Sequence, residues 1–362
     1  MRIAYVINSV EGGGAASPVP AVLGVLRDGG AEIAVFALTA RDRRGEPAMR
    51  AAGFDVYVRG GGETDHGAAL RWLDATLRDW APTHLWTSLT RATLLGQIVG
   101  LCRGWPVVSW QHAAFLKPAN RILLRATQRL SRLWVGDSAA VTRLTAERLR
   151  VPPERLVQWS IFRADPAAVQ ARPWQAGETV RIGSLGRLHR VKGYDVLIEA
   201  LALVATTTPY EVVIAGDGAE LGALEAQANA LGITSLHFAG YAADPAGFLA
   251  NCHLYVQPSR SEGLCVAAHE AMQAGVPVVA SAVGELPGSI VEGKTGATVP
   301  PGDPVALAAA LSALLAEPAR LYEMGQAGRA RVLATFGPER FAATGLAILD
   351  RMRGFGPRDR AS

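Results

Sequence analysis

Short apolar runs alternate with helical segments along almost the whole chain, and this alternation constrains the possible folds more than any other feature. The first half shows it in runs at residues 2–8, 32–38, 55–58, 84–88 and 107–110. Strands that alternate with helices form parallel, doubly wound sheets. Ligands of such sheets bind at the carboxyl ends of the strands. The sequence therefore predicts an α/β fold and directs attention to the loops that follow the strands.

The same alternation resumes at residue 180, which indicates two domains. The chain has 362 residues, of which 49% are hydrophobic, and this is enough for two separate cores. A proline-containing stretch at residues 163–179 has linker character, so we place the boundary near residue 175. We expect one Rossmann-like domain at residues 1–175 and another at 176–335. Residues 336–362 should form a helix that crosses back to the first domain, followed by a frayed tail.

Several classes of protein are poorly supported. No apolar run is long enough to span a bilayer, and the run at residues 3–7 is too short for a secretion signal. Cys102, Cys252 and Cys265 are too few and too scattered for a disulfide framework or a zinc site. No nucleic-acid-binding motif accompanies the modest net charge of +4. We therefore expect a cytoplasmic protein, and these residues give no sign of a metal site or of a cofactor.

The charge is unevenly distributed between the two halves. Residues 1–175 hold 22 Lys and Arg against 14 Asp and Glu, whereas acidic residues are in excess after residue 175. A basic first half suits an anionic partner such as a membrane surface, but a generally Arg-rich surface would give the same balance. The spacing also predicts a basic helix over 118–134, with one face formed by Arg121, Arg125, Arg129 and Arg132. This helix either lies peripherally on anionic lipid at the inner face of the plasma membrane or packs with a solvated arginine face.

The stretch at residues 261–281 carries two glutamates around a predicted helix start. Glycine and proline signals predict a helix over 264–273, so Glu262 precedes the helix and Glu270 lies about two turns inside it. Carboxylates accept hydrogen bonds from hydroxyl groups, and the helix N-terminus between them favours an anion. Two hydroxyl-bearing ends with a phosphate between them describe a nucleotide sugar.

The loop at residues 186–193 supplies cations for such a phosphate. It follows a predicted strand, begins at Gly186, and carries Arg187 and Lys192 ahead of the next helix. Two cations, free backbone amides and the positive end of a helix dipole suit a diphosphate. In the alternative interpretation, both side chains are simply solvated.

Other strand ends carry weaker candidates. Tyr241 follows a strand where a base or ribose could rest, and Gly216 opens a Gly-Asp-Gly that belongs either to a donor site or to a plain turn. The amides of Gly13 and Gly14 follow the first strand, where they either face a phosphate or acceptor or merely join strand to helix. His112 follows another strand and either donates to a ligand oxygen or bonds to its own loop.

The motifs of the second half, in their order and spacing, resemble those of the retaining glycosyltransferases of family 4. This family is part of a larger group, the glycosyl transferases group 1. The matching segments are GRLHRVKG at 186–193, AGDG at 215–218, HFAGY at 237–241, PSRSEGLCVAAHEAMQAGVPVVAS at 258–281 and GKTG at 293–296. The first half matches more loosely, through VINSVEGGGA, WQH and LWVGDSAAV. The resemblance implies the GT-B fold, in which two doubly wound Rossmann-like domains face a central cleft. The first domain would lie on the acceptor side, and the second would bind the nucleotide sugar.

The resemblance also implies roles for residues of the second domain. Arg187 and Lys192 would bind the donor diphosphate. Glu262 would contact the sugar hydroxyls, and Glu270 the ribose hydroxyls. The backbone would approach the phosphates at Gly263, Leu264 and Cys265.

In the first domain, His112 would lie near the donor sugar, and Gly13 and Gly14 match the family's glycine loop. Two departures concern this domain. Many members carry a histidine where this chain has Thr87 and Ser88, and the usual Asn-Gly before the linker is replaced by residues 160–162. Both departures put the identity of the acceptor in doubt.

The sequence thus predicts a hexosyltransferase that moves a sugar from a UDP- or GDP-sugar to a hydroxyl of a glycan or lipid-linked acceptor. We expect retention of configuration by front-face attack, without a metal, in bacterial cell-envelope polysaccharide synthesis. Two alternatives stay open. A sugar-nucleotide epimerase of the same fold would turn over the donor with no acceptor present. A non-catalytic sugar-nucleotide-binding scaffold protein would bind the donor and release no diphosphate.

Overall fold

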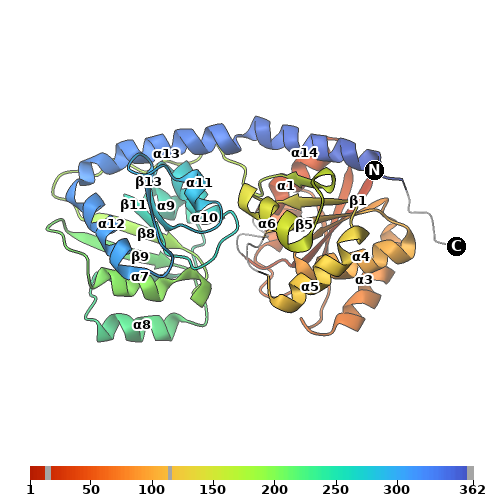
Figure 1. Ribbon diagram of the computed structural model, residues 1–362, viewed down its shortest axis with the longest axis horizontal. Helices are drawn as coiled ribbons and strands as arrows, with labels where there is room; N and C mark the ends of the chain where they lie inside the picture. The colour runs from red at the N-terminus through yellow and green to blue at the C-terminus, as the bar shows by residue number, and fades with distance from the viewer. Residues whose placement is uncertain (13–17, 113–115, 357–362) are drawn as a thin grey trace. The chain divides into compact units, whose positions relative to one another are not determined.

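The computed structural model describes residues 1–12, 18–112 and 116–356 (Figure 1). The chain divides into two compact units, one made of Met1–Arg163 and Glu339–Ser362 and the other of Ala164–Pro338. Each unit contains one sheet in which every strand pair is parallel. The predicted α/β class with two Rossmann-like domains is therefore confirmed.

The first unit is built on a seven-stranded sheet in the order β3-β2-β1-β4-β5-β6-β7. The strands are β1 (Arg2–Ser9), β2 (Glu32–Thr39), β3 (Asp55–Val58), β4 (His84–Ser88), β5 (Val107–Gln111), β6 (Leu133–Gly136) and β7 (Leu156–Gln158). At the centre of the sheet, Tyr5 of β1 pairs with Val35 of β2 on one side and with Trp86 of β4 on the other. All three are fully buried, because helices cover both faces of a parallel sheet.

The helices of the first unit are α1 (Val19–Asp28), α2 (Glu46–Ala51), α3 (His66–Trp80), α4 (Thr90–Arg103), α5 (Pro118–Thr127), α6 (Ala139–Leu149) and α14 (Pro338–Arg353), with short 3-10 turns at Gln128–Leu130 and Pro153–Arg155. From Glu339 onward α14 belongs to this unit. It lies against the core, where Trp159 donates to the carbonyl of Phe341 at 3.0 Å and the ring of His84 bonds to the carbonyl of Met352 at 2.9 Å. Gly345 lies so close to Trp159 that a Cβ there would be 2.4 Å from the indole.

The second unit is built on a six-stranded sheet in the order β10-β9-β8-β11-β12-β13. The strands are β8 (Val180–Leu185), β9 (Tyr210–Ala215), β10 (Leu236–Gly240), β11 (Leu254–Gln257), β12 (Val278–Ser281) and β13 (Gly296–Val299). β13 pairs in parallel with β12 at the edge of the sheet.

The helices of the second unit are α7 (Tyr194–Leu201), α8 (Leu221–Ala230), α9 (Pro245–Ala250), α10 (Val266–Gln273), α11 (Leu286–Ser289), α12 (Pro304–Ala316) and α13 (Leu321–Phe336), with 3-10 turns at Arg190–Lys192 and Pro318–Arg320. Figure 1 shows α7, α8 and α12 on one side of this sheet and α9, α10 and α13 on the other. The core under α7 and α12 is apolar, with Leu197, Val256 and Leu311 each fully buried.

The units divide at Arg163–Ala164 rather than near residue 175. Residues after Ala164 belong to the second unit because they bond to it. The amide of Asp165 donates to the side chain of Gln273 at 2.6 Å, and the amide of Ala171 donates to the carbonyl of Ala274 at 2.7 Å. The linker composition of this stretch therefore does not reflect a free linker.

The predicted basic helix over 118–134 is wrong in its second half. α5 ends at Thr127, and a 3-10 turn at Gln128–Leu130 leads into β6. The turn is held because the carbonyl of Gln128 accepts a hydrogen bond from Trp134 Nε1 at 3.0 Å. Arg121 and Arg125 thus lie on α5, whereas Arg129 and Arg132 do not, and the face of four arginines does not form.

In the part of the chain that the structure describes, no single helix is long and apolar enough to cross a membrane. One bent pair, Pro304–Ala316 with Pro318–Arg353, satisfies the length and composition criteria only when its helices are taken together.

Candidate functional site

The strand order of the second unit places a ligand site between β8 and β11. Chain progression runs outward from β8 through β9 to β10, and in the opposite direction from β11 through β12 to β13. Ligands of such sheets bind at this reversal, beyond the carboxyl ends of the two central strands. The loops at this point are residues 186–193 and 258–265, the same two loops that carry the sequence candidates.

One ion pair bridges the two loops. Lys192 Nζ donates to Glu262 Oε1 at 2.7 Å, and the side chains are 24% and 10% exposed. Burial acts to lower the pKa of Lys192, but the Glu262 carboxylate, together with Cys265 and Tyr194, holds that pKa above its ordinary value. Lys192 is therefore an ammonium group at the sheet's reversal point, close to a carboxylate that is also available to hydroxyl groups.

Two glycines bring the backbones of neighbouring loops into contact. Gly193 has a φ of 68°, and a Cβ on it would lie 2.0 Å from the carbonyl oxygen of Pro258. A Cβ on Gly216 would lie 1.9 Å from the carbonyl oxygen of Gly186, whose own amide donates to Ala215. Gly216 thus supports the loop that begins at Gly186, a packing role that agrees with the plain-turn interpretation.

The second glutamate lies on α10. This helix starts at Val266, two residues later than predicted, because Cys265 takes a left-handed conformation with a φ of 65°. Glu270 is half-buried, and burial raises the pKa of its carboxyl above the ordinary value. Among the described residues the structure gives the carboxyl of Glu270 no hydrogen-bond partner, whereas its backbone carbonyl accepts from the amide of Ala274 at 2.9 Å. A carboxyl without a protein partner can accept hydrogen bonds from the hydroxyl groups of a ligand.

The remaining candidates of this unit lie around the same strand ends. Arg187 is exposed, and the structure shows no hydrogen bond or ion pair for it in the described part of the chain. Tyr241, next to the end of β10, is 50% exposed. Leu264 is buried, and the carbonyl of Gly263 accepts a hydrogen bond from the amide of Glu285 at 2.9 Å.

In the first unit, His112 lies just past β5 with two polar neighbours. Its Nε2 is 2.7 Å from Ser88 Oγ, at the end of β4, and its Nδ1 is 3.4 Å from Asp137 Oδ2, just past β6. The structure thus brings together three adjacent strand ends. Asp137 was not singled out from the sequence, although its place at the carboxyl end of the apolar run Leu133–Gly136 could have identified it. Gly13 and Gly14 lie outside the described residues.

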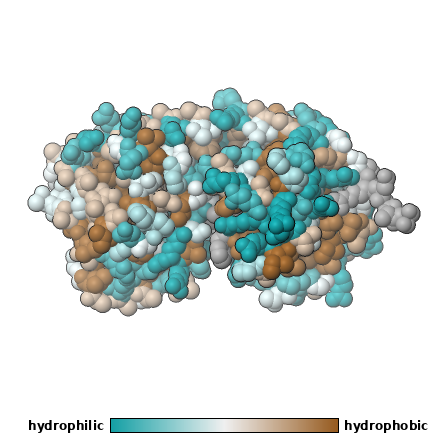
Figure 2. Space-filling view, viewed as in Figure 1, coloured by the Kyte–Doolittle hydropathy of each residue, from teal (hydrophilic) through white to brown (hydrophobic). Residues whose placement is uncertain are grey.

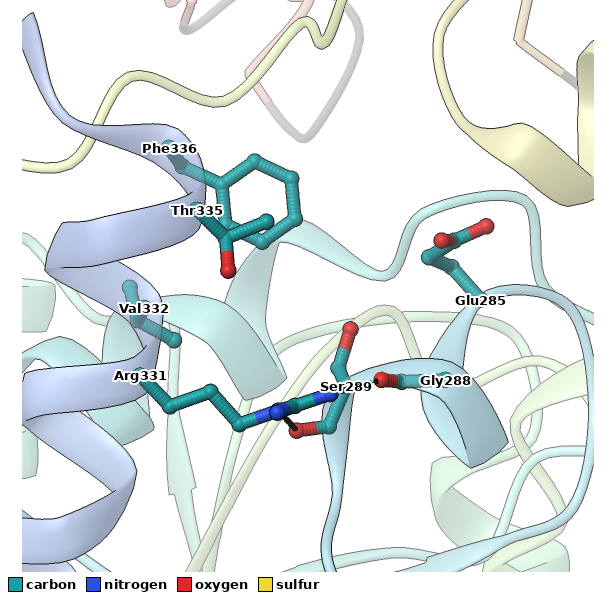
Figure 3. Close-up of a pocket in the computed structure, with 7 residues that line it drawn as sticks. All are labelled: Glu285, Gly288, Ser289, Arg331, Val332, Thr335 and Phe336. Carbon is teal, nitrogen blue, oxygen red and sulfur yellow. Dashed lines mark hydrogen bonds between the residues drawn. The ribbon is translucent and has the colours of Figure 1, made fainter.

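Among the described residues, no group of three or more His, Cys, Asp or Glu side chains could hold a metal ion. A cavity of about 50 Å³ lies between α11 and α13, where Arg331 donates to the carbonyls of Ser289 and Gly288 (Figure 3). It is far smaller than the several hundred Å³ typical of ligand pockets, so we assign it no ligand.

Comparison with known proteins identifies the family of the second unit. Residues 171–331 match the family model of the glycosyl transferases group 1. The D-inositol 3-phosphate glycosyltransferase of Segniliparus rotundus is 33% identical over 188 residues, which are 49% of this chain and 41% of that protein. The GDP-mannose-dependent alpha-(1-6)-phosphatidylinositol monomannoside mannosyltransferase of Mycolicibacterium smegmatis is 34% identical over 209 residues, 54% of this chain and 52% of that protein. The chain thus spans about half the length of the curated relatives it matches.

Solved structures extend the likeness to the fold of the whole chain. HepE of Anabaena, crystallised with UDP and glucose, has a TM-score of 0.85 at 19% identity, covering 98% of this chain and 100% of that one. Sucrose-phosphate synthase of Thermosynechococcus elongatus has a TM-score of 0.81, also at 19% identity, covering 98% of this chain and 99% of that one. At this identity the likeness shows the fold alone, which is GT-B. The likeness to the glycosyl transferases group 1 family thus lies in residues 171–331, which make up most of the second unit.

Proposed function

We propose that this protein is a glycosyltransferase that moves a hexose from a nucleoside diphosphate sugar to a hydroxyl group. The observation that carries the proposal is the Lys192–Glu262 ion pair at the reversal point of the second sheet, inside the segment that matches the family. The pair sets a cation for a phosphate directly beside a carboxylate for sugar hydroxyls. A diphosphate joined to a sugar is the ligand that satisfies both.

In this proposal the cations stabilise the leaving group, and the two glutamates bind the hydroxyl groups of the donor. The bond between the sugar's anomeric carbon and the diphosphate breaks, and negative charge grows on the departing phosphate. Lys192, Arg187 and the N-terminal amides of α10 stabilise that charge more strongly in the transition state than in the ground state. Glu262 would orient the sugar, and Glu270 would accept the ribose hydroxyls.

Names and ligands of similar proteins support UDP or GDP as the nucleotide. One relative is named as GDP-mannose-dependent, and HepE was crystallised with UDP-glucose. The relatives' names also include lipopolysaccharide core and phosphatidylinositol mannoside transferases. They support a glycan or lipid-linked acceptor in cell-envelope polysaccharide synthesis.

We further propose that the anomeric configuration is retained by front-face attack without a metal, as the resemblance to family 4 implies. Glu262 is a poor nucleophile because its Oε1 accepts hydrogen bonds from Lys192 and Ser259. The departing phosphate oxygen would instead take the proton from the acceptor hydroxyl, while that hydroxyl oxygen forms the new bond on the same face.

A surface of the first unit supports contact with anionic lipid. On α5 only Leu124 is buried, whereas Ile122 and Leu123 are 64% and 49% exposed beside the exposed Arg121 and Arg125. Figure 2 shows apolar side chains over α5 and the neighbouring α4, next to hydrophilic ones. Apolar side chains flanked by cations, on a helix without acidic residues, suit the surface of an anionic membrane. The protein would then act peripherally at the cytoplasmic face of the plasma membrane.

The test is a thermal-shift panel of UDP-, GDP-, ADP- and dTDP-sugars, followed by a diphosphate-release assay with and without candidate glycan acceptors. A ligand that binds only the folded state raises the melting temperature. We expect a shift with one nucleotide class and acceptor-dependent release of its diphosphate. Donor turnover into an isomer without acceptor would instead identify an epimerase. Binding without any turnover would identify a scaffold protein, and no shift with any donor would contradict the proposal.

A further inference from the structure

Strand β11 carries polar side chains where a buried strand ordinarily carries apolar ones. Tyr255, Gln257 and Ser259 occupy alternate positions, so they share one face of the strand and its extension. All three are 0% exposed. Burying polar groups costs free energy unless each is hydrogen-bonded, so their presence on one face requires a reason.

These side chains form an unbroken chain of hydrogen bonds that ends on Glu262. The phenol oxygen of Tyr255 is 3.1 Å from the amide nitrogen of Leu185 and 2.7 Å from Gln257 Oε1. Gln257 Nε2 is 2.7 Å from Ser259 Oγ, and Ser259 Oγ is 2.6 Å from Glu262 Oε1. The chain therefore runs from the backbone of β8 to the carboxylate at the site.

The two ends of the chain determine its direction. A carboxylate only accepts hydrogen bonds, so Ser259 must donate to Glu262 and must therefore accept from Gln257. That orients the amide of Gln257 with its oxygen toward Tyr255, whose hydroxyl donates to it. The Tyr255 oxygen is then left to accept from the backbone amide of Leu185, which only donates. The carbonyl of Leu185, at 3.2 Å, is a second acceptor within reach of the Tyr255 hydroxyl, but Gln257 Oε1 at 2.7 Å is the nearer one, and only donation to it continues the chain.

The chain acts on one oxygen of the carboxylate. Lys192, Ser259 and, at 3.4 Å, Gln257 all donate to Oε1 of Glu262. Three donors on Oε1 fix the rotation of the carboxylate, and the Cys265 thiol also hydrogen-bonds to this side chain.

We propose that Tyr255, Gln257 and Ser259 are positioning residues for Glu262, a proposal that rests on the function proposed above. They hold Oε1 against Lys192 so that the carboxylate is presented to the donor sugar in one orientation. The anchor is the backbone of β8, which also begins the loop that carries Lys192, so the cation and the carboxylate are held by the same strand end.

The test compares Gln257→Glu with Gln257→Leu. In the first variant, a protonated carboxyl at position 257 keeps one donor and one acceptor and reproduces the chain, whereas an ionised one only accepts and lies beside the Glu262 carboxylate. Burial and the neighbouring charge both raise the pKa of the introduced carboxyl, so its ionisation falls within a measurable pH range. Leucine removes both hydrogen bonds at every pH.

We expect kcat/KM of Gln257→Glu, divided by that of the wild type, to be highest at low pH. The ratio should fall roughly tenfold or more as the pH rises through the pKa of the introduced carboxyl, because Ser259 then loses its donor and a second carboxylate lies beside that of Glu262. The ratio for Gln257→Leu should be low and independent of pH. Ser259→Ala, which deletes only the last donor, should lower kcat/KM while the thermal shift with nucleotide alone is kept.

Different failures have different meanings. Wild-type transfer accompanied by a flat ratio for Gln257→Glu, or by normal kcat/KM in Gln257→Leu, overturns the positioning role alone. A wild type that binds no nucleotide and transfers no sugar overturns the proposed function and the positioning role together. Melting temperatures of the three variants across the same pH range show whether each is folded where its activity is measured.

Discussion

The two units share a sheet topology but differ in what lies at the reversal point. In the second unit, the loops after β8 and β11 are joined by the Lys192–Glu262 ion pair. In the first, the corresponding reversal lies between β1 and β4, and there the side chain of Asn8 accepts a hydrogen bond from the amide of Ala92 at 2.8 Å. The ion pair of the second unit is formed by two charged side chains, whereas the hydrogen bond at the reversal point of the first unit joins two neutral groups.

Cations near the strand ends of the first unit are already neutralised. Arg59 and Arg91 both bond to Asp65, and Arg59 above all lowers the pKa of that carboxyl to about 2. Arg187 of the second unit, by contrast, has no such partner among the described residues. The difference between the two units therefore rests on Arg187, a cation at a strand end that no carboxylate neutralises among the described residues, as the proposed phosphate site requires.

The largest effect should follow removal of the cation in the second unit. Lys192→Ala should lower kcat roughly hundredfold to thousandfold, because a preorganised positive charge is lost where negative charge develops. Release of nucleoside diphosphate under saturating donor measures the change. Lys294→Ala, which removes an exposed lysine of the same unit, serves as the control and should leave kcat unchanged. Near-normal turnover in Lys192→Ala would remove the lysine from the mechanism.

Acid should destabilise the second unit through His269. This histidine of α10 is fully buried between the carbonyl of Cys265 and Ser289 Oγ, and burial lowers its pKa to about 4. Between about pH 6.5 and 4 the unfolded chain therefore binds a proton that the folded chain does not, so this contribution to stability is lost as the pH falls through that window. The loss should reach about 3 kcal/mol.

Urea unfolding of the wild type and of His269→Gln at a series of pH values measures this effect. The variant should be less stable near neutral pH but should lose less stability on acidification. Parallel pH dependence in the two proteins would show that His269 is not the group responsible.

We expect helix α5 of the first unit to be the part of the protein that contacts lipid. Replacing Arg121 and Arg125 by glutamine should weaken association with vesicles containing anionic lipid about thirtyfold at low ionic strength, since each cation near the surface contributes about 1 kcal/mol. Co-sedimentation with vesicles measures it. Ile122→Asp should act in the same direction, whereas Val305→Asp, at an exposed site of the second unit, should have no effect. Equal binding by all of these variants would exclude α5 as the contact.

The smallest effect should come from the histidine of the first unit. His112→Ala should lower kcat/KM about tenfold, as expected for loss of a single hydrogen-bonding side chain near a substrate. It should leave the thermal shift with nucleotide alone unchanged, because the proposed phosphate ligands lie in the second unit. His66→Ala, an exposed histidine of the first unit, is the control. If His112→Ala abolished nucleotide binding, the division of roles between the units would be wrong.

Much of the fold and the chemistry of the site could be predicted from the sequence. Alternating apolar runs and helical segments predicted both parallel sheets, because burial on two faces gives strands a distinct composition. The same rule directed attention to strand ends and so to Arg187, Lys192 and His112, whereas Glu262 was found from the start signals of the helix that follows it. Local signals failed to predict the end of α5, because that end depends on a tertiary hydrogen bond. Trp134 Nε1 donates to the carbonyl of Gln128 and helps hold the turn that follows the helix.

What the sequence determined by itself was which residues stand at the carboxyl ends of strands, since that depends on local pattern alone. Only the tertiary structure decided which of those ends are neighbours. Lys192 and Glu262 are 70 residues apart in the chain and meet because β8 and β11 are adjacent in the sheet. A role for the buried polar side chains of β11 could be proposed only from the structure, because their chain of hydrogen bonds ends on Glu262. Strand order is set by how whole helices and strands pack, and no local pattern contains that information.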